Sequence, residues 1–426
     1  MKKYNTYTLD NGLRIIHLPS VASVTYCGYQ INAGTRNQSS LEDGMAHFCE
    51  HVTFKGTTSR SAYDILNCLE IVGGELNAFT TKEDTVYYAA ILKEHTPRAV
   101  DLLTDIVFHS VYPQKELDKE KEVVCDEIES YNDSPSELIY DDFENIIFKG
   151  HSIGRNILGD ASKVRAYTTE DVKRFANRFY KPENSIFFCY GDIDFQQLVE
   201  QLKQATSDFP SKTHLKRISK EVNEKNISKE GEQKPLADSM PEYIPQHVVR
   251  DLQTHQAHVM IGCRAYDVHN SKRMPLYLLN NILGGPGMNS RLNLSLREKH
   301  ALVYTVDSTM VSYSDTGIWA IYFGCDPDDV QQCKELVRQE LDRIMQQPLT
   351  KEQLQAAKQQ IKGQIGVACD NRESFALDFG KSFLHYGWEK DITNLYKHID
   401  EITSEQIQQV AQELFAESNL SSLIFR

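Results

Sequence analysis

The stretch Thr168–Asn184, TTEDVKRFANRFYKPEN, returns near the end of the chain as Thr403–Asn419, TSEQIQQVAQELFAESN. The two stretches align without a gap at an offset of 403 − 168 = 235 residues. Each copy begins with a threonine that can cap a helix, and each leads into an apolar strand. The matched positions are Thr168/Thr403, Glu170/Glu405, Val172/Ile407, Ala176/Ala411, Phe179/Leu414, Tyr180/Phe415 and Asn184/Asn419. Convergence on a common helix pattern is the alternative, but an internal duplication explains the agreement better and predicts two similar domains of roughly 200 residues.

The fold class predicted from this duplication is α+β, with two similar α/β domains whose mostly antiparallel sheets are flanked by helices. Residues 207–243 are rich in Lys, Glu, Ser, Asn and Gln and nearly lack aromatic residues. Such a segment cannot bury much surface, so it is predicted to be a polar linker. We therefore expect an N-terminal domain over residues 1–206, a charged linker over 207–243 and a C-terminal domain over 244–426.

Local patterns predict the elements of each domain. An Asn-Gly turn between Tyr4–Leu9 and Leu13–Leu18 predicts a β-hairpin. Further strands are predicted at Val24–Ile31, Thr85–Leu92, Ser185–Tyr190, Ala257–Cys263, Val303–Val311 and Gly317–Gly324. Helices are predicted at Ala62–Val72, Thr96–His109, Lys115–Tyr131 and Pro275–Leu283.

Composition and charge limit the possible partners. Of the 426 residues, 40% are hydrophobic and 25% charged, which is typical of a folded globular protein. The net charge of −14 argues against nucleic acid or an anionic membrane as the main partner. We find no apolar run long enough to span a membrane and no apolar core of an export signal near the start. Nine cysteines without CxxC pairs indicate free thiols in a reducing compartment, so a cytoplasmic location is expected.

The segment His47-Phe48-Cys49-Glu50-His51 carries the strongest chemical signal. On a helix, His47 and His51 are separated by four residues, so both imidazoles project from one face and can bind one metal ion. Glu50 shares that face, where its carboxylate can take a proton from water activated by the metal. The order is the inverse of His-Glu-x-x-His and matches a known zinc peptidase signature.

A hydrolytic zinc ion usually has three protein ligands, so one ligand is missing from this segment. Glu120 and Glu127 lie seven residues apart on a predicted helix and therefore share a face. One of them could bind the metal while the other orients a ligand or the water. Periodicity alone does not say which, and an acidic helix without other context is more often simply solvated.

Gly44–Thr57, GMAHFCEHVTFKGT, resembles the active-site helix of the insulinase/pitrilysin zinc peptidases, and most closely the short bacterial and mitochondrial processing-peptidase branch. The resemblance covers essentially the whole chain. It implies that Glu127, which follows His51 by 127 − 51 = 76 residues, is the third zinc ligand and that Glu120 is a supporting acid of the catalytic site. Cys49 replaces the bulky aliphatic residue often found at that position, and we expect it to be a core residue rather than a fourth ligand.

Two further segments fit the same family. The stretch Gly73–Thr80, GGELNAFT, resembles the family's edge segment, which implies that Asn77, Ala78 and Phe79 bind an extended substrate. An ordinary turn followed by a strand explains these residues equally well without the family context. In the second half, the resemblance implies that Arg297 and Tyr304, seven residues apart, bind substrate and stabilise the oxyanion. The preceding Gly284–Gly287 stretch lacks the Gly-Lys-Ser/Thr ending of a phosphate loop, so we discount that reading.

The resulting hypothesis is a zinc endopeptidase with one Zn²⁺ per chain, held by His47, His51 and Glu127, that cleaves unfolded peptides inside a closed chamber. Because this chain carries both the zinc motif and the Arg/Tyr pair, the resemblance implies a homodimer; a heterodimer with an inactive paralogue is the alternative. A non-catalytic scaffold or partner subunit of the same fold is the competing class. A maturation peptidase dedicated to one precursor would share the chemistry, and the sequence does not specify the cleavage preference or whether the domains open and close.

Overall fold

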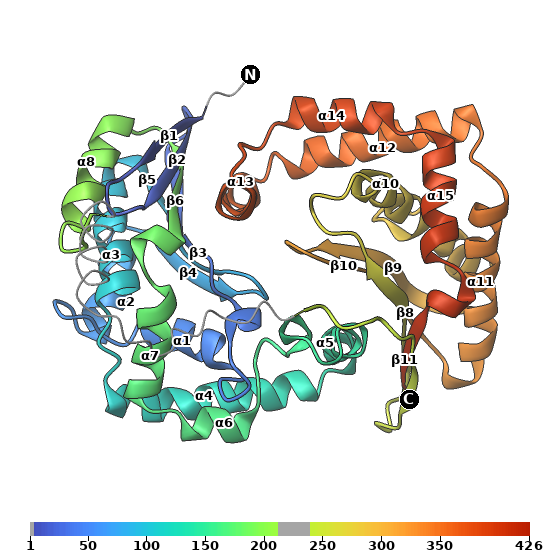
Figure 1. The fold of residues 1–426 in the computed structure, drawn as a ribbon, viewed down its shortest axis with the longest axis horizontal. Coiled ribbons are helices and arrows are strands. Elements are labelled where there is room, and N and C mark those ends of the chain that lie inside the picture. Colours follow the sequence, from blue (N-terminus) through green and yellow to red (C-terminus); the bar gives the residue numbers. More distant parts are fainter. Residues whose placement is uncertain (1–3, 212–238) are drawn as a thin grey trace, which may run out of the picture. The chain divides into compact units, whose positions relative to one another are not determined.

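The computed structural model describes residues 4–211 and 239–426. Most of the predicted linker, residues 212–238, lies outside the described residues. The chain forms two compact units (Figure 1). The first comprises the described parts of Met1–Ile128 and Asn156–Ser239 together with Ala368–Lys390, and the second comprises Glu129–Arg155, Met240–Val367 and Asp391–Arg426.

The first unit is built on a six-stranded sheet with the order β1-β2-β6-β3-β5-β4. Neighbouring strands are antiparallel except β2 and β6, which are parallel. The predicted hairpin is present as β1 and β2. The bounds are β1 (Asn5–Thr8), β2 (Arg14–Pro19), β3 (Val24–Ile31), β4 (Glu75–Thr80), β5 (Thr85–Leu92) and β6 (Ser185–Gly191).

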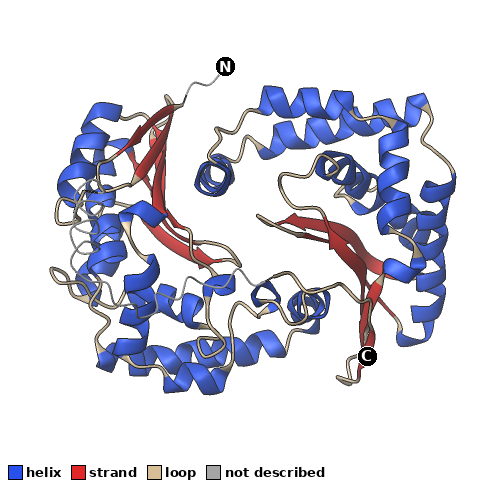
Figure 2. Cartoon of the chain, in the orientation of Figure 1, coloured by secondary structure: helices blue, strands red, loops and turns tan. Residues whose placement is uncertain are grey.

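A layer of helices covers one face of this sheet and forms its main core with it (Figure 2). Fully buried apolar residues of the sheet, such as Tyr29, Tyr87 and Phe187, pack there against residues such as Phe48 and Phe175 from the helices. The helices are α1 (Met45–Thr53), α2 (Ala62–Glu70), α3 (Thr96–His109), α4 (Gln114–Asn132), α6 (Ala161–Ala166), α7 (Thr169–Phe179) and α8 (Phe195–Ala205).

The opposite face of the first sheet is covered by α13 (Arg372–Tyr386), a helix from the second half of the sequence. Phe379 packs edge-on against Tyr4 and Tyr190, with ring centroids 5.3 and 6.3 Å apart. The guanidinium of Arg14 on β2 donates to the carbonyls of Phe383 and Leu384 at the end of α13, at 2.9 and 3.0 Å. These contacts make α13 an integral part of the first unit.

The second unit repeats this arrangement. Its five-stranded sheet has the order β7-β11-β8-β10-β9, from β7 (His247–Arg250), β8 (Ala257–Ala265), β9 (Val303–Ser312), β10 (Gly317–Cys325) and β11 (Ser421–Phe425). One face carries α10 (Arg273–Gly284), α11 (Val330–Gln346) and α15 (Ser404–Leu414), while α12 (Lys351–Ala368) and α14 (Ile392–Glu401) complete the helical layer. The other face is covered by α5 (Pro135–Ile147), a helix from the first half of the sequence.

The two sheets share topology and register, as expected of a duplication. β7, like β2, is joined in parallel to its neighbour, and the remaining pairs are antiparallel in both sheets. At the predicted offset, 188 + 235 = 423, the cross-strand row Phe188–Gly28–Tyr88–Asn77 corresponds to Leu423–Met260–Tyr322–Asp307. The predicted α+β class with two similar domains is confirmed.

The compact units differ from the predicted residue ranges 1–206 and 244–426 at two helices. α5 and α13 are each exchanged into the unit of the other half of the sequence. The physical reason is that each sheet has two apolar faces, and the helices that follow its own strands cover only one of them. Sequence periodicity predicts that a helix has an apolar face, but not which sheet that face covers.

Among the described residues, no helix is long and apolar enough to cross a membrane. All nine cysteines are free, and most of them are buried in the cores of the two units.

The repeated threonines give a matched test of the duplicated helix start. Thr168 and Thr403 each accept a hydrogen bond from the backbone N–H three residues later, closing a capping box with Asp171 and Gln406. Because an N-cap oxygen stabilises a helix by about 1 kcal/mol, Thr168→Ala and Thr403→Ala should each lower the melting temperature by about 1 °C, measured by calorimetry. Thr168→Ser and Thr403→Ser keep the hydroxyl and should melt near wild type; an equal loss in these controls would contradict the capping role.

Candidate metal centre

Helix α1 carries the His-x-x-Glu-His segment, and its start is fixed by a close backbone contact. Gly44, the residue before the helix, has φ +85°, and Gly159 lies so close that a Cβ there would come within 2.3 Å of the Gly44 Cα. Because glycine offers no side-chain cap, the amide oxygen of Gln38 accepts from the Ala46 N–H at 2.7 Å instead. Gln38 was not among the predicted site residues, because it belongs to no motif.

His47 and His51 from α1 and Glu127 from α4 come together in the first unit. Figure 1 labels these two helices. The Glu127 Oε2 lies 3.7 Å from His47 Nε2 and 3.4 Å from His51 Nε2, and one ligand atom from each residue lies within 4.8 Å of the others. Two ligands of a tetrahedral zinc ion at bond lengths near 2.0–2.1 Å are separated by about 3.3 Å. The three side chains therefore fit a zinc ion without rearrangement of the helices.

Glu120 lies outside this group and contacts His51 from the other side of its ring. The His51 Nδ1 and the Glu120 Oε1 are 2.9 Å apart. The other oxygen of Glu120, Oε2, forms an ion pair with the Lys55 Nζ at 2.6 Å. The geometry thus separates the two glutamates that periodicity left equivalent: Glu127 faces both Nε2 atoms, while Glu120 holds the ring from behind. Lys55 lies in the turn just after α1 and belongs to none of the sequence motifs, so only the structure places it at this site.

The local electrostatics suit a metal ligand set. Burial, reinforced by the neighbouring His51, lowers the pKa of His47, so its imidazole is neutral and offers a lone pair. Burial also acts to lower the pKa of His51, but its bonds to the Glu120 and Glu127 carboxylates prevail and raise that pKa to about 9. The bond to His51 in turn lowers the pKa of Glu127. A metal ion entering at neutral pH therefore displaces a proton from His51.

Glu50 is buried on the same helix as the two histidines, but its hydrogen-bond partner lies on the sheet. Thr80, the last residue of β4, donates its hydroxyl to the Glu50 Oε2 at 2.7 Å. Burial raises the pKa of Glu50, while the Thr80 bond partly opposes this shift. The result is a carboxylate with one oxygen tied to the sheet, whose basicity is increased by its surroundings. Thr80 was not among the predicted site residues.

Cys49 is fully buried and points away from the ligand group, into the core of the first unit. Burial raises the pKa of its thiol to about 12, so the sulfur is not ionised at neutral pH and is a poor metal ligand.

The segment with Asn77, Ala78 and Phe79 forms most of β4, which ends the sheet order of the first unit. β4 pairs with β5 on one side, and no described strand pairs with its other side. β4 also lies against α1, so the Thr80–Glu50 bond links this edge to the helix that carries the two histidines.

Arg297 and Tyr304 lie together in the second unit. Arg297 belongs to a helical turn at Asn293–Lys299, and Tyr304 lies at the start of β9. The Arg297 guanidinium carbon is 5.7 Å from the centre of the Tyr304 ring, and the tyrosine is 82% exposed. An exposed guanidinium and phenol at this separation are free to bind a polar group together.

Comparison with known families identifies both halves of the chain. Residues 15–161 match the family model "Insulinase (Peptidase family M16)", and residues 166–361 match "Peptidase M16 inactive domain". The first range includes His47, Glu50, His51, Glu120 and Glu127, while the second includes Arg297 and Tyr304 but no His-x-x-Glu-His segment.

Relatives extend over the whole chain. The uncharacterized zinc protease YmxG of Bacillus subtilis is 32% identical over 98% of this chain and 97% of its own length. An uncharacterized zinc protease of Streptomyces coelicolor is 31% identical over 98% of this chain and 88% of its own length. Among solved structures, a protease from Helicobacter pylori shares the fold with a TM-score of 0.86 at 22% identity, covering 100% of both chains.

The contact between Glu120 and His51 predicts a loss of metal affinity without loss of a ligand. Glu120→Gln should weaken Zn²⁺ binding by about 10–100-fold, because the amide no longer holds the His51 ring with a charged acceptor. Competition with a chromophoric chelator measures the affinity. Glu122→Gln, on an exposed face of the same helix, is the charge-matched control and should bind as wild type; equal affinity of both variants would exclude the supporting role of Glu120.

Proposed function

Because the chain belongs to the insulinase family of metallopeptidases, family M16, we propose that it is a zinc-dependent endopeptidase that hydrolyses unfolded peptides. One observation carries the proposal: His47, His51 and Glu127 converge at distances that suit a single zinc ion, with Glu50 on the same helix. A scaffold role would require none of these side chains to converge.

We assign one zinc ion per chain to this site, with His47, His51 and Glu127 as ligands. The neutral His47 and the ionised Glu127 are the forms that bind a metal ion. The relatives named as zinc proteases support the identity of the metal. When bound, zinc supplies Lewis-acid chemistry, polarising the scissile carbonyl and lowering the pKa of water.

The residues of the chain itself then divide the remaining work. The Glu50 oxygen that is not held by Thr80 accepts the proton of the attacking water and later delivers it to the leaving amine. Thr80 fixes the carboxylate so that this oxygen stays aimed at the metal side of α1. Glu120, backed by Lys55, keeps the His51 ring in place during turnover.

Substrate binding is assigned to the two remaining groups. An extended peptide pairs with the free side of β4 through main-chain hydrogen bonds at Asn77, Ala78 and Phe79, which gives affinity with little sequence selectivity. Arg297 holds a carbonyl or carboxylate of the peptide, and the Tyr304 phenol donates to the developing oxyanion.

The proposed assembly is a homodimer that encloses the substrate in a chamber. Support comes from the resemblance to short family members and from the presence of both the zinc motif and the Arg/Tyr pair in one chain. A closed chamber would admit unfolded peptides and exclude folded proteins by size.

Two substitutions test the metal and the base separately. Glu127→Gln should lose most of the zinc, measured by elemental analysis, and should lose cleavage of a quenched unstructured peptide with it. Glu50→Gln should keep about one zinc per chain yet lose about 100-fold or more in kcat, because the amide cannot accept the proton. A chelator should abolish wild-type cleavage, and added zinc should restore it.

Each other outcome has a definite meaning. No zinc in the wild type would sink the enzyme proposal and favour the scaffold. Full zinc and full activity in Glu127→Gln would remove Glu127 as a ligand. Zinc without cleavage of any peptide would contradict the general endopeptidase and favour a missing partner chain or a single dedicated precursor.

Tyr304→Phe removes only the phenol oxygen and tests the second unit. Loss of an oxyanion donor should lower kcat by about 100-fold while zinc content stays unchanged. Tyr63→Phe, at another exposed tyrosine (73% exposed), is the matched control and should retain full activity. Unchanged kcat in Tyr304→Phe would exclude an oxyanion role for this residue.

A further inference from the structure

Among the described residues, nothing pairs with the outer edge of the strand β7 in the second sheet. β7 is terminal in the order β7-β11-β8-β10-β9, and no described strand pairs with its outer side. Apolar side chains on and beside it are exposed, with Ile244 at 67%, Val249 at 53% and Leu252 at 41%. Open edges with exposed apolar residues are uncommon, because they invite another strand to pair.

The first unit shows what covers the same position. β2 corresponds to β7 in the duplicated sheets, and its outer edge is covered by β1 in antiparallel pairing. Beside that edge, α8 packs on α3 and contributes Leu198 and Leu202 to the core. None of the described residues of the second unit takes the place of β1 or α8.

The direction of the free backbone groups follows from the ladder between β7 and β11. The carbonyls of Gln246 and Arg250 accept from the N–H groups of Ser422 and Arg426, at 2.8 and 3.1 Å. In a parallel ladder alternate residues face the neighbour, so the N–H and C=O groups of His247 and Val249 face outward. These are the groups that an added strand would use.

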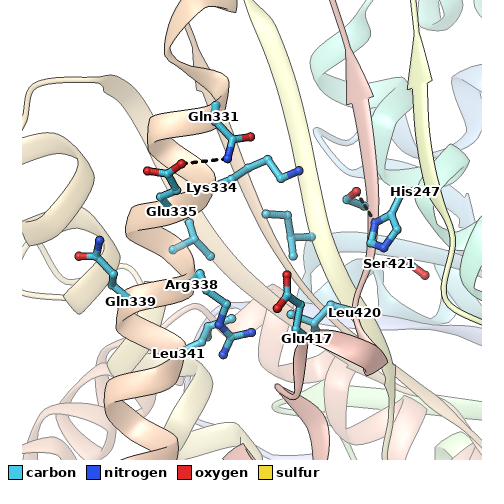
Figure 3. Close-up of a pocket in the computed structure, with 13 residues that line it drawn as sticks. His247, Gln331, Lys334, Glu335, Arg338, Gln339, Leu341, Glu417, Leu420 and Ser421 are labelled. Atoms are coloured by element: carbon cyan, nitrogen blue, oxygen red, sulfur yellow. Dashed lines mark hydrogen bonds between the residues drawn. The ribbon is translucent and has the colours of Figure 1, made fainter.

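A cavity of about 420 Å³ adjoins this edge (Figure 3). Its floor includes Val337, Leu341 and Leu420, and its rim includes His247, Lys334 and Glu417. In Figure 3 the Lys334 amine and the Glu417 carboxylate extend into the space between α11 and β11. The volume lies in the range of ligand pockets, and the mixture of an apolar floor with charges of both signs suits one side chain with an apolar stem and a polar end.

We propose that the outer edge of β7 and the adjoining cavity form a docking site for an extended peptide segment. The segment adds to β7 in antiparallel pairing, as β1 does to β2, and its main chain bonds to His247 and Val249. Because the side chain of His247 lies in one cross-strand row with Ser422 and Ile261, on the side of the cavity, the residue paired with it directs its own side chain toward the cavity. Backbone pairing with one side-chain pocket is an established mode of peptide recognition.

This site is separate from the proposed catalysis, since all its residues belong to the second unit and the metal ligands to the first. A second copy of the chain could also pair through β7. The cavity favours a peptide, because strand-to-strand pairing between two copies needs no pocket for a side chain.

Hydrogen exchange with mass spectrometry tests the docking directly. The probe is a proline-free unstructured peptide of about 20 residues, added to the full-length Glu50→Gln protein so that it is not cleaved. We expect the segment around residues 244–252 to exchange more slowly with the probe present. Val249→Pro removes one outward N–H without touching the ladder to β11 and should weaken the probe affinity at this segment about tenfold. Val249→Thr keeps the N–H, so the probe should slow exchange at residues 244–252 as much as in the protein with Val249.

A second proline variant tests whether the loss comes from misfolding. Light scattering tests whether a second copy of the chain, rather than the peptide, pairs with β7. His247→Pro removes the other outward N–H, together with the 2.9 Å bond between the His247 ring and the Ser422 hydroxyl, and should give at least the same loss of affinity. Val249→Pro should keep the wild-type melting temperature, because the Val249 N–H takes no part in the ladder to β11. Absence of protection at 244–252, or equal protection in the proline variants, would overturn the proposal. A second outcome would also overturn it: slower exchange at 244–252 that appears without the probe as the protein concentration rises. In that case light scattering would show dimers of the wild type but monomers of Val249→Pro, and the occupant of the edge would be a second copy of the chain. Because no step requires turnover, failure here is distinguishable from failure of the peptidase proposal.

Discussion

The hydrogen bond between His51 and Glu120 is the contact on which the metal centre depends. At 2.9 Å it joins α1 to α4 and fixes the ring whose other nitrogen faces Glu127. A buried carboxylate is costly unless it is paired, and Lys55 supplies the second partner at 2.6 Å. The three ionisable groups therefore stabilise one another only in this arrangement. Without it, the His51 ring would lose the bond that holds its Nε2 toward Glu127.

That local arrangement is supported by a duplicated frame. The sheets have the same strand order apart from β1, and each is closed on its second face by a helix from the other half of the sequence. Loss of an exchanged helix would expose an apolar sheet face and so lower the free energy of unfolding. The face covered by α13, for example, carries Phe188 and Tyr190. The exchange thus makes the folding of each half depend on the other.

The sequence was sufficient for features that depend on local spacing. The shared face of His47, Glu50 and His51 follows from helical periodicity, and the capped helices at Thr168 and Thr403 follow from their own side chains. It was insufficient where contacts join distant segments: the bond from Thr80 to Glu50, the capping of α1 by Gln38 and the exchange of α5 and α13 leave no periodic signal. Periodicity left the choice between Glu120 and Glu127 open because both share a face, and the assignment of Glu127 came from the family resemblance. In the structure, the position of α1 against α4 places Glu127, and not Glu120, near both Nε2 atoms. Arg297 and Tyr304 came from family resemblance alone, because an arginine and a tyrosine seven residues apart carry no chemical signature.

The open edges of the two sheets are best understood together. A free strand edge endangers solubility, and proteins usually shorten, charge or cover it. The first unit covers β2 with β1, yet among described residues it leaves β4 open beside α1, the edge proposed to bind substrate. The second unit leaves β7 open as well, and β7 is short, only four residues, with Arg250 held by Asp142. A short strand limits edge-to-edge pairing between copies, while its two outward residues are the ones proposed to bind a peptide strand. Among the described residues, the edge of β7 is short but uncovered, and this combination is consistent with the binding of a peptide strand.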